Sequence, residues 1–324
     1  MTTHAIRIHE HGGPEVLRWE SVDVAEPQAG EVLLRQTAVG LNFIDTYHRT
    51  GLYPLPLPAV LGREAAGVVE AVGPDCPDWQ VGDRAAYALE PGSYCERRTM
   101  HASRLVKLPD GIEETTAAAM MLKGLTAQYL LRRSYVVRDG DTILLHAAAG
   151  GVGLIACQWA KALGATVIGT VGSEEKAALA KAHGCDHTIL YDQEDLVARV
   201  KEITDGAGVP VVYDSVGQAT FEASLDCLAP LGTLVSFGQS SGPVKPFNIG
   251  VLASKGSLSL TRPTLATYIA QRDDLVASSN ELFEHVLRGD IKIEIGHTYP
   301  LKDAAQAHRD LEARRTTGST LLLP

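Results

Sequence analysis

The stretch from Asp141 to Lys176 constrains the fold of this chain more than any other segment. A short apolar run, Ile143 to Leu145, is followed by the glycine-rich segment HAAAGGVG and by residues with helical spacing that end at Gly164. A second apolar run, Thr166 to Val171, comes directly afterwards. This order of strand, glycine turn, helix and strand predicts one βαβ unit of a parallel sheet.

The glycine-rich turn has the spacing AxGxxG, with Ala148, Gly150 and Gly153 at the three small positions. Gly150 would let the backbone approach a pyrophosphate, and Gly153 would let the helix and strand pack closely. The N-terminus of the following helix would face the anion. Small residues at this spacing also occur by chance in tight turns, but the patterns on both sides favour a dinucleotide site that includes Gly151 and Val152.

The end of the second strand indicates which dinucleotide binds. An acidic residue about 20 positions beyond the glycine turn would pair with the free 2′-hydroxyl of NAD. The chain instead offers Gly172, Ser173 and Lys176, so a 2′-phosphate would meet little repulsion and could contact the serine and the lysine. Glu174 and Glu175 lie close by, and Lys176 could equally be a solvated charge on a helix face. We favour NADPH as the cofactor.

The length of 324 residues is typical of about two domains, and the pattern along the chain changes once. Residues 1–122 predict a β-rich domain, because alternating segments such as 31–38 and 65–72 are separated by turn residues. In residues 123–262, strands alternate with helices, which predicts an α/β fold with a doubly wound, Rossmann-type parallel sheet. We expect residues 263–324 to complete the first domain, because the apolar C-terminal segment would otherwise be exposed.

Ligands of such sheets bind outside the carboxyl ends of the strands. Tyr191 follows the third strand and could contact the 2′-phosphate, whereas His146 ends the first strand without a sign of a proton relay and is expected to pack. Small and polar residues follow the fourth and fifth strands and would line the diphosphate and the nicotinamide ribose, namely Ser215, Val216, Phe237, Gly238, Ser240 and Ser241. The serines could also cap turns, which does not exclude cofactor contact.

The charge and the cysteines argue against several functional classes. A net charge of −10 gives no general attraction to nucleic acid or to an anionic membrane. No apolar stretch reaches the length of a bilayer span and the N-terminal residues lack the core of a signal peptide, so we expect a cytoplasmic protein. The five cysteines form no CxxC pair, which argues against a disulfide framework and against a structural zinc site.

Three further segments carry a resemblance to a known family. GREAAGVVEAVG, at 62–73, is similar to the pattern GHExxGxxxxxGxxV with arginine at the histidine position. VGLNFIDTYHRTGLYP, at 39–54, and KGLTA, at 123–127, add two more matches. With these motifs the chain resembles, over essentially its whole length, the medium-chain dehydrogenases/reductases and, more narrowly, their zinc-free quinone oxidoreductases, which include zeta-crystallin. The resemblance implies a GroES-like catalytic domain beside the Rossmann domain.

The departures from the zinc-dependent members concern the metal. A catalytic zinc needs about three protein ligands, yet Asn42 and Arg63 stand where the zinc enzymes supply two of them. Arginine cannot lose its proton and therefore cannot ligate. The loop between Tyr87 and Tyr94 is only ALEPGS, without the cysteines of a structural zinc lobe. The implied reaction is metal-free reduction of an electron-poor acceptor, such as a quinone or an alkene conjugated to a carbonyl, by the nicotinamide.

The resemblance also implies the catalytic residues. It places Asn42, Asp45 and Tyr47 in the nicotinamide and acceptor pocket and Tyr53 at its mouth. Asn42 can donate to an amide or carbonyl oxygen, and either tyrosine can donate to a reduced oxygen. Asp45 could equally be a helix N-cap or turn acid, and Tyr53 could be a surface aromatic residue.

Further contacts are implied by the resemblance elsewhere in the chain. Thr126 is expected near the nicotinamide, and Arg314, in a C-terminal helix predicted over 303–315, is similar to an arginine that contacts the phosphate. Convergence of Lys176, Tyr191 and Arg314 on the 2′-phosphate would be more telling than any one of them. The neighbours Arg63 and Glu64 are expected to form a structural ion pair rather than a pair in the acceptor pocket.

The sequence and the resemblance leave three functions open. The leading hypothesis is an NADPH-dependent quinone oxidoreductase without a metal, and the alternative is an NADPH-dependent enone or alkenal reductase with Tyr53 as a candidate proton donor. A cofactor-binding structural or RNA-interacting protein, as some zeta-crystallin relatives are, is the alternative of another class, and the acidic charge weighs against RNA. The strand at 257–261 could pair edge to edge with its twin, which would make the protein a homodimer.

Overall fold

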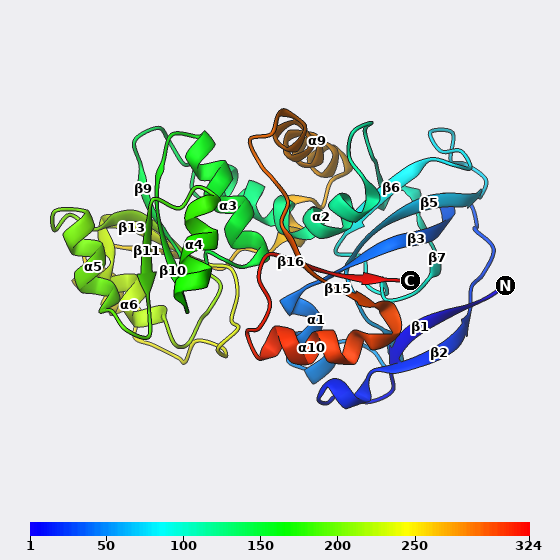
Figure 1. Ribbon diagram of the computed structural model, residues 1–324, viewed down its shortest axis with the longest axis horizontal. Helices are drawn as coiled ribbons and strands as arrows, with labels where there is room; N and C mark the ends of the chain where they lie inside the picture. The colour runs from blue at the N-terminus through cyan, green and yellow to red at the C-terminus, as the bar shows by residue number, and fades with distance from the viewer. The chain divides into compact units, whose positions relative to one another are not determined.

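The computed structural model describes all 324 residues, and the chain packs as two compact units (Figure 1). Unit 1 comprises Met1–Leu125, Ile269–Leu287 and Ile293–Pro324, and unit 2 comprises Thr126–Tyr268 and Arg288–Lys292. The structure thus divides the chain after Leu125 and Tyr268, and not after residues 122 and 262. The short segment 288–292 packs with unit 2, although it lies in the part of the tail predicted to complete the first domain.

Unit 1 is built on two sheets and carries four of the helices. The larger sheet has the order β15-β16-β3-β5-β6-β8 with β7 paired to β3, and the smaller has the order β2-β1-β4. The strands are β1 (Thr2–Ile8), β2 (Arg18–Asp23), β3 (Glu31–Leu41), β4 (Ala59–Val60), β5 (Glu64–Val72), β6 (Arg84–Ala88), β7 (Arg97–His101), β8 (Val106–Lys107), β15 (Ile295–Pro300) and β16 (Ser319–Leu323). The helices are α1 (Phe43–Thr50), α2 (Glu114–Tyr129), which runs across the boundary after Leu125, α9 (Arg272–Arg288) and α10 (Ala304–Glu312).

The long strand β3 organises the core of unit 1. Its apolar residues Val32, Leu34, Val39 and Leu41 are at most 2% exposed and lie in one core cluster. β3 pairs antiparallel with β5, β7 and β16, and so joins the N-terminal segments to the C-terminal strand. It ends at Leu41, beyond the predicted end at residue 38, because β16 pairs with it as far as Leu41.

Unit 2 contains one six-stranded sheet in which every pair of neighbours is parallel. The strands are β9 (Thr142–Leu145), β10 (Thr166–Val171), β11 (His187–Leu190), β12 (Val209–Asp214), β13 (Leu228–Ser236) and β14 (Ser259–Thr261). Their spatial order β11-β10-β9-β12-β13-β14 is the Rossmann order 3-2-1-4-5-6, which confirms the predicted fold class. The helices are α3 (Gly151–Ala162), α4 (Glu174–Ala182), α5 (Leu196–Ile203), α6 (Phe221–Asp226), α7 (Gly250–Ser254) and α8 (Leu265–Tyr268).

The boundaries of two elements in unit 2 differ from the prediction. The helix predicted over 220–229 ends at Asp226, and the following strand begins at Leu228 instead of residue 233. Leu228 already pairs with Val209, and the register shifts before the regular ladder from Val211 to Thr233 begins. Pairing within the sheet therefore overrides the local helical pattern of this segment.

The helices and the cysteines of the whole chain show two further features. None of the helices combines the length and the sustained hydrophobicity that crossing a bilayer requires. All five cysteines carry free thiols and are buried.

We predict that Leu322→Ala lowers the free energy of unfolding by about 2–5 kcal/mol, the cost of a cavity in a well-packed core. Leu322 in β16 is fully buried in the core cluster of unit 1, whereas its neighbour Leu323 is 36% exposed. Leu323→Ala is the matched control and should cost at most about 0.5 kcal/mol. Urea denaturation of the two variants measures the difference, and equal losses would contradict the packing described for β16.

Candidate cofactor and acceptor sites

The glycine turn of unit 2 connects β9 to the N-terminus of α3. A Cβ atom on Gly153 would lie 2.4 Å from the Ala147 carbonyl oxygen and 2.6 Å from that of Ala148, so only glycine fits there, as predicted from the spacing. A Cβ atom on Gly150, the N-cap of α3, would meet only the Ala147 oxygen, at 3.2 Å. The first turn of α3 contains no acidic residue. The helix N-terminus therefore suits an anionic group, which agrees with the predicted place of the pyrophosphate.

Three of the predicted contacts of the 2′-phosphate, Ser173, Lys176 and Tyr191, belong to unit 2, and the first two lie at the start of α4. Ser173 is the N-cap of this helix, and its hydroxyl accepts a hydrogen bond from the Lys176 backbone N–H at 3.3 Å. Lys176 is half-buried and not a freely solvated charge. A Cβ atom on Gly172 would lie 2.6 Å from the Tyr191 hydroxyl oxygen, so the glycine is required for the tyrosine to approach. Two segments distant in sequence, residues 172–176 and the loop at Tyr191, thus bring a hydroxyl, a cation and a phenol to one strand edge.

Asp214, a residue that the sequence analysis did not single out, holds the next loop at this edge. Its Oδ1 accepts hydrogen bonds from the backbone N–H groups of Val216 at 2.7 Å and Gly217 at 3.0 Å. Its Oδ2 accepts from the hydroxyls of Thr220 at 2.7 Å and Ser224 at 3.1 Å. An acid at the end of a buried strand was the available signal, because a carboxylate is rarely buried without several donors.

The other predicted residues of this edge lie in the loops after β12 and β13. The Ser241 hydroxyl donates to the Val216 carbonyl at 2.7 Å and accepts from the Ala219 N–H at 3.0 Å, so it ties the two loops together. This is the turn-capping role that the sequence analysis kept open for the serines. The Ser240 N–H donates to the Ser215 carbonyl at 3.2 Å, and Phe237 and Gly238 both donate to the Asp214 carbonyl.

His146 at the end of β9 belongs to the same buried network. Its ring nitrogens lie 3.0 Å from the Thr170 hydroxyl and 2.9 Å from the Ser224 hydroxyl. Burial lowers its pKa, and the nearby Asp214 charge only partly opposes this. The packing role expected for His146 is therefore accompanied by two hydrogen bonds.

In unit 1, the buried Glu64 determines how Asn42 is oriented. The Asn42 side-chain nitrogen donates to Glu64 Oε2 at 2.7 Å and to the Gly40 carbonyl at 3.4 Å. Both partners are acceptors, so the nitrogen must face them and the amide oxygen faces away. The donor capacity of Asn42 is used here by Glu64 and Gly40. Contact of Asn42 with a ligand stays a prediction.

The expected ion pair between Arg63 and Glu64 is wrong. Glu64 Oε2 pairs with Lys123 Nζ at 2.9 Å, and its Oε1 accepts from the Leu122 N–H at 2.6 Å. Arg63 donates from Nη1 to the Leu89 carbonyl at 2.8 Å. Successive residues of an extended segment point to opposite sides, which is why the two neighbours have different partners.

Asp45 lies in the first turn of α1 and is fully buried. Its Oδ2 accepts hydrogen bonds from the Asn42 backbone N–H and from the Tyr94 hydroxyl, both at 2.9 Å. Burial raises the pKa of Asp45 to about 7, although these two hydrogen bonds and the charges of Arg63 and Lys123 favour the carboxylate. The structure therefore gives Asp45 the capping role that was one of its two expected roles, and contact with a ligand stays a prediction.

Tyr47, in α1, and Tyr53, in the loop after it, form an aromatic pair in unit 1. Their ring centroids are 5.1 Å apart with an interplanar angle of 60°, and Phe43 extends the group 5.6 Å from Tyr47. The Tyr53 N–H donates to the Tyr47 carbonyl at 3.1 Å, which holds the loop after α1 against the helix. Both tyrosines are half-buried, so each has an apolar ring in contact with the protein and part of its surface in solvent.

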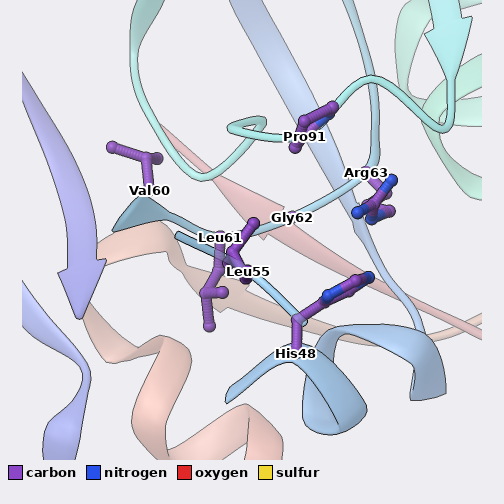
Figure 2. A pocket seen from close by; sticks show the side chains of 7 residues that line it. All are labelled: His48, Leu55, Val60, Leu61, Gly62, Arg63 and Pro91. Atoms are coloured by element: carbon purple, nitrogen blue, oxygen red, sulfur yellow. The ribbon is translucent and has the colours of Figure 1, made fainter. Parts of the chain in front are cut away.

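A small recess in unit 1 lies beside these residues. Figure 2 shows the His48 ring projecting from α1 toward the Arg63 guanidinium, with apolar lining residues across from it. Burial and the Arg63 charge lower the pKa of His48 to about 4, although the nearby Tyr53 and Pro54 backbone favours protonation. The recess is lined by His48, Leu55, Val60, Leu61, Gly62, Arg63 and Pro91. No sequence signal distinguished His48, because an isolated histidine in a helix is most often a packing residue.

The remaining two predicted residues lie in different units. Thr126 belongs to unit 2, in α2, and is 7% exposed. Arg314 belongs to unit 1, where it is exposed. The prediction that Arg314 lies within the C-terminal helix is wrong: α10 ends at Glu312, and Arg314 adopts a left-handed conformation with φ of 58° that ends the helical path.

We predict that the unfolding free energy of Asp45→Asn rises relative to the parent protein by about 2–4 kcal/mol between pH 4 and pH 8. The native pKa of Asp45 is about 7, against 3.8 for the ordinary group, so ionisation in this interval destabilises only the parent protein. Asparagine keeps an oxygen that accepts from Asn42 and Tyr94. Denaturation of both proteins at a series of pH values cancels the opposite effect of His48, and a constant difference would contradict the prediction.

The side chains that could bind a metal ion are scattered in this structure. No group of three or more His, Cys, Asp and Glu side chains is arranged so that it could hold a metal ion. The side chain of Asn42 turns its nitrogen to Glu64, and Arg63 donates to a carbonyl.

Comparisons with known proteins identify the family. A model described as alcohol dehydrogenase GroES-like domain matches residues 28–139, and one described as zinc-binding dehydrogenase matches residues 151–276. A quinone oxidoreductase of Pseudomonas aeruginosa is 58% identical over 98% of this chain and 99% of its own length. The crystal structure of Escherichia coli quinone oxidoreductase complexed with NADPH has a TM-score of 0.97 and 51% identity over the full length of both chains. A 2-haloacrylate reductase of a Burkholderia species is 47% identical over 98% of each chain. The chain belongs to the quinone oxidoreductase family of the medium-chain dehydrogenases/reductases.

Proposed function

We propose that this protein is an NADPH-dependent quinone oxidoreductase that acts without a metal. One observation in unit 2 carries the proposal. The N-terminus of α3 follows β9, and the cluster of Ser173, Lys176 and Tyr191 follows β10 and β11, which lie beside β9 in the same sheet. The first feature suits a diphosphate and the second suits a 2′-phosphate. The NADPH bound to the Escherichia coli relative supports the same cofactor here.

The cofactor would be held mainly by unit 2. The turn Ala148 to Gly153 takes the diphosphate through backbone N–H groups, and the cluster at α4 takes the 2′-phosphate. Asp214 keeps the loops after β12 and β13 in place, so their residues can line the nicotinamide ribose. Thr126 and Arg314 remain proposed contacts. When bound, NADPH supplies the reducing equivalents as a hydride from its nicotinamide ring.

The acceptor would be held by residues of unit 1. Glu64 and Gly40 fix the Asn42 nitrogen, so its amide oxygen can accept a hydrogen bond from a hydroxyl of the reduced acceptor or from a carboxamide, whereas the quinone itself has no donor for it. Tyr47 and Tyr53 present flat apolar rings to the planar ring of a quinone and can donate a proton or a hydrogen bond to a reduced oxygen. The hydrogen-bonded first turn of α1 keeps these groups in a fixed geometry.

Metal independence is part of the proposal. A zinc ion would need deprotonatable or lone-pair donors at the positions of Asn42 and Arg63. The asparagine nitrogen is committed to Glu64, and the Arg63 guanidinium, which donates to the Leu89 carbonyl, is not a metal ligand. A quinone is electron-poor enough to accept a hydride without such activation.

Reduction of a conjugated double bond is the second candidate. The relative named 2-haloacrylate reductase favours it, since its name describes an alkene conjugated to a carboxyl group as the substrate of that protein. The same cofactor and pocket would serve, with Tyr53 as the proton donor. The relatives named quinone oxidoreductase are more similar to this chain, which favours the first candidate.

We also propose a homodimer and a cytoplasmic location. β14 is the edge strand of the sheet in unit 2, and its Leu260 is 36% exposed, so a second copy could pair along it. Size-exclusion chromatography at micromolar concentration tests the dimer. Five buried free thiols suit a reducing compartment.

The assay that tests the function compares quinones with alkenals. We expect kcat/KM for 1,4-benzoquinone with NADPH to exceed that for short alkenals by about tenfold or more, which corresponds to about 1.4 kcal/mol of transition-state stabilisation. Dialysis against a chelator should leave the rate unchanged. A markedly higher efficiency on alkenals would favour the second candidate, and a rate that depends on added zinc would contradict metal independence.

The choice of cofactor is tested at α4. We expect Lys176→Ala to weaken NADPH binding by about tenfold, from the loss of one charge-assisted contact, and to leave NADH binding unchanged. Lys181→Ala is the matched control, because Lys181 is exposed in the last turn of the same helix. Fluorescence titration of the reduced cofactors measures both affinities. An equal effect of Lys176→Ala on NADPH and NADH would contradict the assignment.

A further inference from the structure

In unit 1, a chain of hydrogen-bonded polar groups joins α10 to the first turn of α1. Figure 1 labels both helices. Arg49 Nη1 lies 2.9 Å from His308 Nδ1, and His308 Nε2 lies 3.0 Å from the Tyr94 hydroxyl. The Tyr94 hydroxyl lies 2.9 Å from Asp45 Oδ2. At the other end, Arg49 Nη2 donates to Glu312 Oε1 at 2.7 Å.

The direction of every hydrogen bond in this chain follows from Arg49. A guanidinium can only donate, so His308 Nδ1 must accept. The neutral imidazole then carries its hydrogen on Nε2 and donates to the Tyr94 oxygen. Tyr94 in turn donates its own hydrogen to Asp45. One arginine therefore selects the tautomer of a histidine and the rotamer of a tyrosine hydroxyl.

Burial keeps the chain in this state. His308 and Asp45 are fully buried, and Tyr94 and Arg49 are at most 1% exposed. Burial and the neighbouring Arg49 charge lower the pKa of His308 to about 3, so the imidazole stays neutral at physiological pH. Arg49 is anchored by three partners, since its Nε also donates to the Gly12 carbonyl at 3.1 Å. A network of hydrogen bonds of this kind gives a buried group one orientation.

The last member of the chain acts on Asn42. Asp45 Oδ2 accepts from Tyr94 and from the Asn42 backbone N–H, so the tyrosine and the start of α1 share one oxygen atom. The Asn42 side chain is fixed separately by Glu64. The position of the Asn42 amide therefore depends on Glu64 through its side chain and on Asp45 through its backbone.

We propose that His308 and Tyr94 are positioning residues for the acceptor site. His308, held as the Nε2–H tautomer by Arg49, directs the Tyr94 hydroxyl at Asp45, and Asp45 then fixes the backbone of Asn42. The inference rests on the proposed function, in which Asn42 lines the acceptor pocket. It adds that a residue of the C-terminal helix sets the geometry of that pocket without touching the acceptor.

The first test compares His308→Gln with His308→Leu. Glutamine can accept from Arg49 and donate to Tyr94, whereas leucine fills a similar space and can do neither. We expect kcat/KM for 1,4-benzoquinone to stay within about threefold of the parent for glutamine and to fall about tenfold or more for leucine, as the loss of a hydrogen bond to a charged group implies. The Kd of NADPH should be unchanged in both. Equal activity of the two variants would overturn the proposal.

The second test uses Tyr94→Phe and the pH profile of kcat/KM. Without the hydroxyl, the Asp45 carboxylate keeps only the Asn42 donor, while Arg63, Lys123 and Glu64 remain around it. Because the Asp45 carboxylate holds the Asn42 backbone, we expect kcat/KM of the parent to rise as Asp45 ionises, and we expect this ascending limb to move to higher pH by about one unit in the variant. A structural role alone would lower Tm and leave the limb in place, which would count against the proposal.

A measurement on the parent protein does not depend on the stability of any variant. Long-range ¹H–¹⁵N spectra, with His308→Gln to assign the signal, should show the Nε2–H tautomer of His308 without titration between pH 5 and pH 9. The Nδ1–H tautomer or a titrating ring would overturn the proposal. If the parent fails to oxidise NADPH with any quinone, the proposed function fails, whereas an active parent with unaffected variants removes only this inference.

Discussion

The buried Glu64 carboxylate is the interaction on which the candidate acceptor site depends. It has no exposed surface, and it receives donors from Leu122, Lys123 and Asn42. Removing one partner of a buried ion pair leaves an uncompensated charge and lowers stability by about 3–5 kcal/mol. A Cβ atom on Gly40 would lie 2.3 Å from Glu64 Oε2, so β3 needs a glycine there. One carboxylate thus explains a glycine in a strand, a buried lysine and the orientation of an amide.

In each unit, buried carboxylates accept hydrogen bonds that hold neighbouring backbone segments in place. In unit 2, Asp214 receives four donors and holds the loops at the ends of β12 and β13. In unit 1, Glu64 and Asp45 together hold the start of α1. Each site therefore contains carboxylates whose partners are protein groups, and the groups left to meet a ligand are neutral amides, hydroxyls, backbone N–H groups and a lysine. This composition is compatible with the proposed anionic cofactor and the proposed metal-free reduction of the acceptor.

Much of unit 2 could be predicted from the chain alone. The AxGxxG turn and the alternation of strands and helices are local patterns, and they predict the parallel Rossmann-type sheet and the close packing at Gly153, whereas the order of the strands is known only from the structure. The predictions that were wrong concern positions where a local pattern competes with pairing. The strand that begins at Leu228 and the turn at Arg314 are examples, since sheet pairing and a left-handed residue end helices that the sequence would continue. The ion pair expected between Arg63 and Glu64 failed because neighbours in an extended segment face opposite sides.

The glycine spacing, the alternation of strands and helices and the residue types at positions 42 and 63 predict a Rossmann-type parallel sheet, a phosphate-binding turn and positions without zinc ligands, because spacing and residue type are local properties of the chain. That the side-chain nitrogen of Asn42 turns to Glu64 and that Asp45 is buried are features of the tertiary structure. Both depend on partners distant in sequence: Glu64 and Lys123 for the amide, and Tyr94, His308 and Arg49 for the carboxyl. The direction of a hydrogen bond is a property of the pair of groups, so it cannot be read from either residue alone.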